Sequence, residues 1–366
     1  MLPHIQRDLG LSGTQIGILT GLPVIFFAAV AVPGSLLIAR TGVLSTLVFG
    51  LLVTALGSGL RALAPAAHPL YVATMLMAAG IALMQPAMPA AVRRWLPERI
   101  SLGTAVYTNG LIVGEIVAVS IMLPVVMPLV GDSWRPAIAL WSAPVVLIAG
   151  LICVLAPRTP ADTPRDAAGT RAPWWPDWRD PLVWRLGLIL ASVNTMYFCT
   201  NGFLPAYLES VRRPDLISAG LIALNFGQLP ASLLLLLAAG RLERRVWPYL
   251  VSNLLAVLSI GALISTASGF TVFWAGLLGF ACGAALALGL ALSPLLSEPI
   301  DVPRVSAGMF TISYLIAMLI SVVAGATWDA IGVARAAFLP IAAAGLPALV
   351  LAPTLRFRRP GTRVGR

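Results

Sequence analysis

Long apolar runs recur along the whole chain, and each is bounded by charged residues, Pro or Gly. A bilayer core about 30 Å thick is crossed by about 20 residues of α-helix, so runs of this length are typical of membrane spans. Eleven spans are predicted, over residues 15–39, 44–64, 70–91, 101–124, 134–156, 182–208, 216–239, 247–267, 270–296, 305–327 and 334–354. The pattern therefore predicts an all-α, polytopic membrane protein.

Composition agrees, because 59% of the residues are hydrophobic and 10% are charged, which is more apolar surface than a soluble chain of 366 residues could bury. The net charge of +10 comes from 24 basic residues, all Arg, which lie mainly between the apolar runs. This placement indicates membrane topology and argues against a nucleic acid partner. Eighteen arginines fall in one set of alternating segments and six in the other, so the first set and the C-terminal tail are predicted to be cytoplasmic.

A polar segment rich in Pro, Asp and Arg separates two groups of spans. We expect an N-terminal bundle over 1–156, a cytoplasmic central loop over 157–181, a C-terminal bundle over 182–355 and a cytoplasmic Arg-rich tail over 356–366. Trp174, Trp175 and Trp178 precede the next span, where an interfacial aromatic belt is a better explanation than a binding role.

A weak internal repeat relates the two groups. Arg99-Ile100-Ser101-Leu102-Gly103 is echoed by Arg304-Val305-Ser306-Ala307-Gly308, and similar shifts relate several shorter strings. Parallel halves of a transporter predict such spacing. If the spacing of the repeat holds along the whole chain, the helix over 182–208 corresponds to a helix that ends near residue 4. We therefore expect a full protein of six plus six helices, with its first helix apparently missing from this chain. A natural eleven-span protein is the alternative.

Parallel halves around a polar loop resemble the major facilitator superfamily. Leu22-Pro23, Gly59-Leu60-Arg61, Gln85-Pro86-Ala87-Met88-Pro89 and Gly227-Gln228 are similar to the branch that includes cyanate and 2-nitroimidazole transporters. The resemblance implies two six-helix bundles and a small polar or anionic solute. It also implies a gating loop after the second helix of each half, here at Arg40 in the first half and at Arg241, Glu243, Arg244 and Arg245 in the second, although the first half lacks the family's acidic residue.

Glu115 is the main candidate for proton coupling. A carboxylate deep in a span costs about 2.5 to 3.5 kcal/mol on insertion scales and therefore usually faces a cavity or a partner. Thr104, Thr108 and Glu115 fall on one helical face, which Leu111 interrupts. The alternative is a Glu that only holds two helices together through hydrogen bonds.

Arg61 and several amides are candidates for the cavity. Arg61, near the external end of its span, can attract an anion or simply snorkel to water. The amide and phenol groups can contact the substrate or form interhelical hydrogen bonds, and they are Gln85, Asn109, Asn194, Tyr197, Asn201, Asn225 and Gln228. Gly202 and Pro205 can bend or unwind the helix over 182–208.

Other chemistry finds no support in the sequence. The chain has no Lys, which excludes a Walker A nucleotide site, and it lacks a clustered nucleophile and base at membrane depth. Cys153, Cys199 and Cys282 lie inside apolar runs without metal-site spacing, and we expect neither a metal nor a cofactor. Gly276, Gly279, Gly283 and Gly289 indicate close helix packing.

We therefore predict a non-enzymatic, multi-pass transporter of the plasma (inner) membrane. It moves a small solute by alternating access within the lipid bilayer, coupled to protons and without nucleotide or nucleic acid. Multidrug efflux and a non-transporting membrane sensor are the alternatives.

Overall fold

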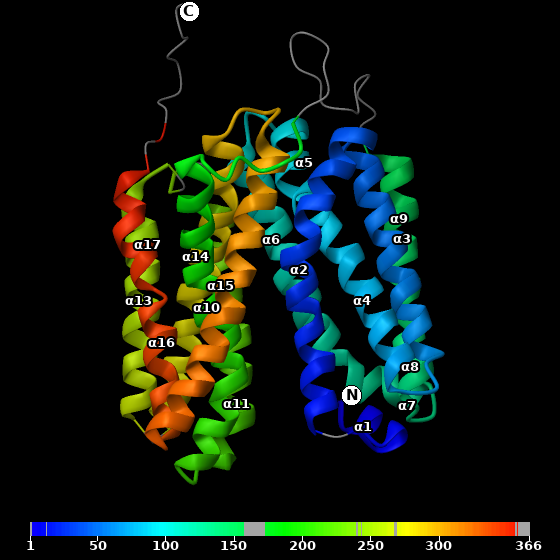
Figure 1. The fold of residues 1–366 in the computed structure, drawn as a ribbon, viewed down its shortest axis with the longest axis vertical. Helices are drawn as coiled ribbons and strands as arrows, with labels where there is room; N and C mark the ends of the chain where they lie inside the picture. The colour runs from blue at the N-terminus through cyan, green and yellow to red at the C-terminus, as the bar shows by residue number, and fades with distance from the viewer. Residues whose placement is uncertain are drawn as a thin grey trace, which may run out of the picture. The chain divides into compact units, whose positions relative to one another are not determined.

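The computed structural model describes residues 2–11, 13–156, 173–238, 241–242, 244–266, 269–355 and 357, and the regular secondary structure in these ranges is helical (Figure 1). Within them, eleven helical segments are long and apolar enough to cross a membrane. They match the eleven predicted spans with ends that differ by a few residues, so the all-α polytopic prediction is confirmed. Glu243 and most of the central loop and tail lie outside the described residues.

The first of two compact units comprises residues 1–95, 113–178 and 299–314. Its helices are α1 (Leu2–Leu9), α2 (Gly13–Thr41), α3 (Val43–Ala62), α4 (Ala67–Met84), α5 (Ala87–Trp95), the π-helical η1 (Met122–Val126), α7 (Met127–Leu129), α8 (Trp134–Leu140) and α9 (Ser142–Leu155). It also holds the end of α6 (Ile100–Ile121) and the start of α15 (Val302–Ile331).

The second unit comprises residues 96–112, 179–298 and 315–366. Its helices are α10 (Pro181–Ser210), η2 (Pro214–Leu216), α11 (Ile217–Phe226), α12 (Gln228–Leu237), α13 (Val246–Ser265), α14 (Phe270–Leu296), η3 (Ala334–Ala337), α16 (Phe338–Ala343), α17 (Leu346–Leu351) and η4 (Ala352–Thr354). The start of α6 and the end of α15 complete it.

Glycines bring helix backbones together in both units, and for Gly279 of α14 this agrees with the close packing that the sequence indicates. In the first unit, a Cβ added at Gly80 would lie 2.5 Å from the backbone nitrogen of Thr54, so α3 and α4 touch along their backbones. In the second, a Cβ at Gly279 of α14 would lie 2.0 Å from the carbonyl oxygen of Leu224 in α11. Packing of this kind drives helix association in lipid, where burial of apolar side chains gives little advantage.

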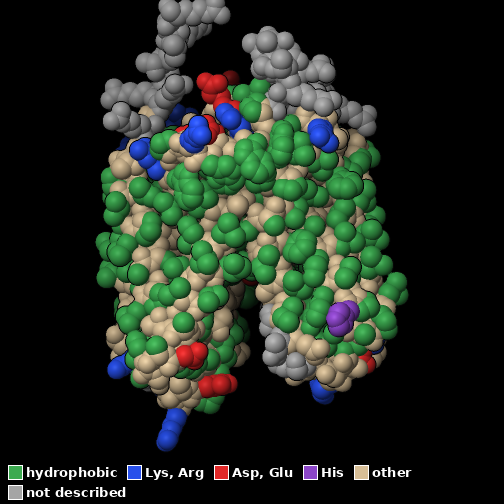
Figure 2. Space-filling view, in the orientation of Figure 1, with side chains coloured by type: hydrophobic (Ala, Val, Ile, Leu, Met, Phe, Trp, Pro, Cys, Tyr) green, Lys and Arg blue, Asp and Glu red, His purple; other side chains and the backbone are tan. Residues whose placement is uncertain are grey.

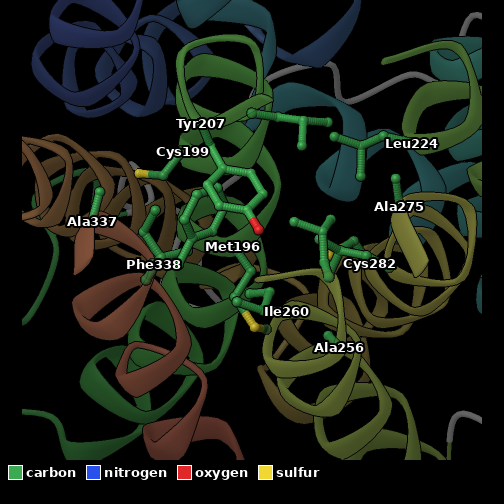
Figure 3. Packing of buried hydrophobic residues seen from close by; sticks show 14 of the residues in the cluster. Met196, Cys199, Tyr207, Leu224, Ala256, Ile260, Ala275, Cys282, Ala337 and Phe338 are labelled. Atoms are coloured by element: carbon green, nitrogen blue, oxygen red, sulfur yellow. The ribbon is translucent and has the colours of Figure 1, made fainter. Parts of the chain in front are cut away.

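A buried cluster fills the centre of the second unit. Met196, Cys199 and Tyr207 of α10 pack with Ile260 of α13 and Phe338 of α16 (Figure 3). The Tyr207 hydroxyl donates a 3.1 Å hydrogen bond to the carbonyl of Ile264, so its polar atom is satisfied inside the cluster. This cluster fixes the position of α10, which carries three of the candidate site residues.

Large apolar side chains are exposed along the flanks of the helices. Leu56, Leu147 and Val154 of the first unit and Leu258 and Val322 of the second are 56% exposed or more. In Figure 2, hydrophobic side chains cover the sides of the helices while Arg, Asp and Glu gather near their ends. Exposed apolar surface of this extent fits a lipid environment.

Four predicted spans are interrupted by turns in the described structure, those over 134–156 and 334–354 at Trp141 and at Ala344-Gly345, and two more beside candidate site residues. The run over 70–91 breaks at Gln85-Pro86, between α4 and α5, and the run over 216–239 breaks at Gly227, between α11 and α12. Pro86 has no N–H to continue the helical ladder, which accounts for the first break. Of the two effects considered for Gly202 and Pro205, bending and unwinding, the helix shows no unwinding, because α10 stays helical from Pro181 to Ser210.

Candidate functional site

Arg61 lies in the last turn of α3, and its guanidinium contacts α4. Its Nη1 donates a hydrogen bond to the Met77 sulfur at 3.3 Å, and its Nε is buried without a partner. Among the residues that the structure describes, no carboxylate forms an ion pair with Arg61. Thioethers are weak acceptors, so the contact with Met77 does little to stabilise this cation.

The register of α3 and α4 places Met77 relative to Arg61. A Cβ at Gly57 would lie 2.3 Å from the backbone nitrogen of Met77, so these two residues are level. Gly57 precedes Arg61 by one turn, so the backbone of Met77 lies about 6 Å from the level of Arg61 toward the middle of the span. The Arg61 guanidinium therefore contacts the side chain of a residue whose backbone lies deeper in the span.

Gln85 stands at the break between α4 and α5. Its Nε2 donates a 3.3 Å hydrogen bond to the hydroxyl of Tyr314 in α15, while its Oε1 is buried and has no partner among the described residues. An unsatisfied buried amide oxygen costs about 1 to 3 kcal/mol, so a group of this kind invites a functional explanation.

Aromatic rings surround the Tyr314 end of this contact. The Phe27 ring of α2 lies 5.4 Å from the Tyr314 ring, and the Phe310 ring stacks on it at 6.2 Å with 15° between the planes. One turn before Tyr314, the Thr311 hydroxyl donates a 2.9 Å hydrogen bond to the carbonyl of Ala28. Sequence reasoning missed these aromatic residues, and the one signal for them was a tyrosine hydroxyl inside an apolar span.

Tyr197, Asn201 and Asn225 form a closed network between α10 and α11. The Tyr197 hydroxyl donates to Asn225 Oδ1 at 2.5 Å, Asn225 Nδ2 donates to Asn201 Oδ1 at 3.0 Å, and Asn201 Nδ2 donates to the Tyr197 carbonyl at 3.1 Å. Asn194 is also buried in α10 but makes none of these bonds. In this arrangement the three side chains form hydrogen bonds between α10 and α11, which is the alternative to substrate contact given for them above.

Asn109 joins α6 to α12. The Ser232 hydroxyl donates to Asn109 Oδ1 at 2.8 Å, and Asn109 Nδ2 donates to the carbonyls of Ser232 at 3.0 Å and Ala105 at 2.8 Å. Gln228 is 3% exposed, and its Nε2 reaches the Asn225 carbonyl at 3.5 Å, so it extends the polar contacts of α11 only weakly.

The structure separates the polar stripe predicted on α6. Thr104 and Thr108 are buried, whereas the side chains of Leu111 and Glu115 are exposed. Thr104 and Ser101 line a small cavity together with residues of α12 and α14. The cavity has room for about one water molecule and is too small for a solute. Glu115 therefore stands apart from the two threonines.

The arginines of the expected gating loops lie at helix ends. Arg40 is exposed in the last turn of α2, and Arg241, Arg244 and Arg245 are exposed between α12 and α13. Glu243, the acidic member of the second loop, lies outside the described residues. In the described part of the chain, no three His, Cys, Asp or Glu side chains gather as metal ligands would.

A family model described as Major Facilitator Superfamily matches residues 1–227. The chain is 27% identical over 329 residues to the 2-nitroimidazole transporter of Escherichia coli (strain K12), covering 87% of this chain and 80% of that protein. It is 26% identical over 295 residues to the cyanate transport protein CynX of the same organism, covering 80% and 75%.

Solved structures show the same fold. The transporter FucP in its outward conformation matches with a TM-score of 0.74 at 16% identity, over 96% of this chain and 92% of that one. The proton:xylose symporter XylE matches with a TM-score of 0.73 at 12% identity, over 95% and 89%. With a family model that covers more than half of its length, this chain belongs to the major facilitator superfamily, as its sequence resemblance predicted.

Proposed function

We propose that this chain is a secondary active transporter of the plasma (inner) membrane that moves a small polar or anionic solute by alternating access. Its relatives named for 2-nitroimidazole and for cyanate support this class of solute. Both solutes are small and polar, and cyanate is an anion. The C-terminal tail lies in the cytoplasm, in keeping with the arginine distribution.

The Arg61 guanidinium is the observation that carries the anionic part of this proposal. A cation inside a spanning segment is costly unless it is paired, hydrated or functional. Arg61 donates to a thioether and keeps a buried Nε without a partner. A small anion that reaches this position would supply the charge-assisted hydrogen bonds that Met77 does not.

Glu115 couples transport to protons in this proposal. The helical run through α6, η1 and α7 extends from Ile100 to Leu129, and Glu115 lies near its middle. At about 1.5 Å per residue it is roughly 21 Å from either end of the run. An exposed carboxyl at that level is costly against lipid, and it can exchange a proton if water reaches it from alternate sides.

Uptake into proteoliposomes tests the proposal. The purified protein is reconstituted, and uptake of labelled cyanate and 2-nitroimidazole is followed with and without an imposed pH gradient. Accumulation that follows the gradient supports proton-coupled transport. Uptake that stops at equal solute concentrations on the two sides would exclude proton coupling. If neither solute is taken up but larger apolar compounds are moved, the protein would belong to the multidrug transporters.

A further inference from the structure

We propose that Gln85 and the rings of Phe27, Phe310 and Tyr314 form a subsite for a planar heteroaromatic solute that carries a ring N–H. This inference rests on the proposed transport function and specifies the chemistry of its substrate. All four residues belong to the first compact unit, and they come from α2, the α4–α5 break and α15.

The side-chain carbonyl of Gln85 is buried and lacks a hydrogen-bond partner among the described residues. The two polar atoms of its side chain have one described hydrogen bond between them, from Nε2 to the Tyr314 hydroxyl. Whichever way the amide is turned, one of its polar atoms lacks a partner. As placed, this is the acceptor Oε1, so the group that would satisfy it is a donor such as a ring N–H.

The rings of Phe27, Phe310 and Tyr314 form an aromatic cluster beside this carbonyl. Aromatic pairs prefer offset-stacked or edge-to-face contacts with centroids roughly 4.5 to 7 Å apart, and both pairs here fall in that range. Tyr314 sits between Phe27 and Phe310 and is 9% exposed, so the rings are packed on one another. A planar solute would enter by replacing Tyr314 against one of its ring neighbours, with the N–H directed at Gln85.

Gln85 also lies at a break in the helical run. Gln85 and Pro86 form a turn between α4 and α5, so this amide lies where the helical ladder is already interrupted. Irregular backbone at membrane depth is tolerated where it is buried in protein or lines a cavity. A side chain at such a point can move without breaking a continuous helix.

In this proposal, Gln85 and Arg61 recognise different features of a solute at two levels along α4. Met77 and Gln85 are eight residues apart on that helix, which corresponds to about 12 Å. Gln85 therefore distinguishes heteroaromatic solutes by a neutral hydrogen bond, at a level different from that of the guanidinium.

Two ligands test the inference in the unaltered protein. Binding of 2-nitroimidazole and of its N-methyl derivative is measured on the reconstituted protein, at a pH where the ring nitrogen keeps its proton. The N–H compound is expected to bind about five- to tenfold more tightly, the equivalent of one net hydrogen bond. Equal affinity for the two compounds overturns the proposal without any variant.

The variant Gln85→Leu is then expected to remove this preference, because leucine offers no acceptor to the ring N–H. Tyr314→Phe keeps the ring and the Gln85 carbonyl, so the preference survives in it. Thr311→Val is the control, because it breaks the hydrogen bond from α15 to the Ala28 carbonyl of α2 and leaves the Gln85 amide in place. A preference that persists in Gln85→Leu, or is lost equally in Thr311→Val, overturns the assignment.

The same measurements separate this inference from the proposed function. Cyanate uptake without binding of either nitroimidazole contradicts the subsite alone. Absence of both uptake and binding contradicts the transport proposal and the subsite together.

Discussion

Asp8 of α1 accepts a 2.9 Å hydrogen bond from the indole Nε1–H of Trp134, the first residue of α8. The Arg135 guanidinium also pairs with this carboxylate, and it lies 4.6 Å above the Trp134 ring. The contact fixes α1 against the end of the first unit, where Ile5 and Leu11 are buried beside Trp134.

This contact predicts a pH-dependent stability. The hydrogen bond from Trp134, with smaller contributions from Arg135, lowers the pKa of Asp8 below its ordinary value of 3.8. A lowered folded-state pKa adds stability that is complete above the ordinary value and is lost as the pH falls through the lowered one. Asp8→Asn should therefore reduce the melting temperature slightly at neutral pH and have no effect under strongly acidic conditions. An equal reduction at both would show that only packing was disturbed.

Arg61→Gln is expected to raise the KM for cyanate by about tenfold or more, because a charge-assisted hydrogen bond contributes roughly 1.5 to 3 kcal/mol. The KM for 2-nitroimidazole should change less, since that solute carries no full charge while its ring N–H is intact. Arg99→Gln, at an exposed position before α6, is the control and should leave both values unchanged. Intact cyanate transport in Arg61→Gln would show that this arginine has only a structural role.

Glu115→Gln should abolish accumulation driven by a pH gradient and spare exchange of solute across the membrane. The amide cannot exchange a proton but keeps the size and polarity of the side chain. The matched control is Glu98→Gln, an exposed position outside the spans. Unchanged uphill transport in Glu115→Gln would remove this residue from the coupling mechanism.

A double-mutant cycle on Tyr197→Phe and Asn225→Leu should give a coupling energy of about 0.6 to 2 kcal/mol, the range for interhelical hydrogen bonds in membranes. The measurement is unfolding of the reconstituted protein by denaturant. Coupling near zero would mean that the 2.5 Å contact between the Tyr197 hydroxyl and Asn225 does not stabilise the packing of α10 on α11.

Gly279→Ala should destabilise the second unit by about 1 to 3 kcal/mol, because the new methyl group would meet the Leu224 carbonyl and force the backbones apart. Gly261→Ala, in α13, has nothing within 4 Å of the added Cβ and serves as the control. Equal thermal stability of the two variants would contradict the close approach of α11 and α14.

The spans were predictable because Arg, Pro and Gly interrupt the apolar runs, and a helix in lipid must be continuous across the core. Gln85 and Pro86 were visible for a related reason, since both are unusual within an apolar run. The partners of these residues were not predictable. In a helix that is apolar on every side, no amphipathic pattern identifies the face that carries Phe27 or Met77. The amides of α10 were found by type, but only the structure shows that they bond to one another.

The division of α15 between the two units affects biosynthesis. Residues 299–314 complete the first unit, yet they are made after the chain has been extended by roughly 120 residues beyond Trp178. At about 5 to 20 residues per second, the ribosome takes some 6 to 24 s to cover that distance. During this interval the Gln85 amide is already in the nascent chain but Tyr314 is not, so the hydrogen bond between them forms only late in synthesis. Deletion of the second half would leave the first unit without residues 299–314 and without this bond.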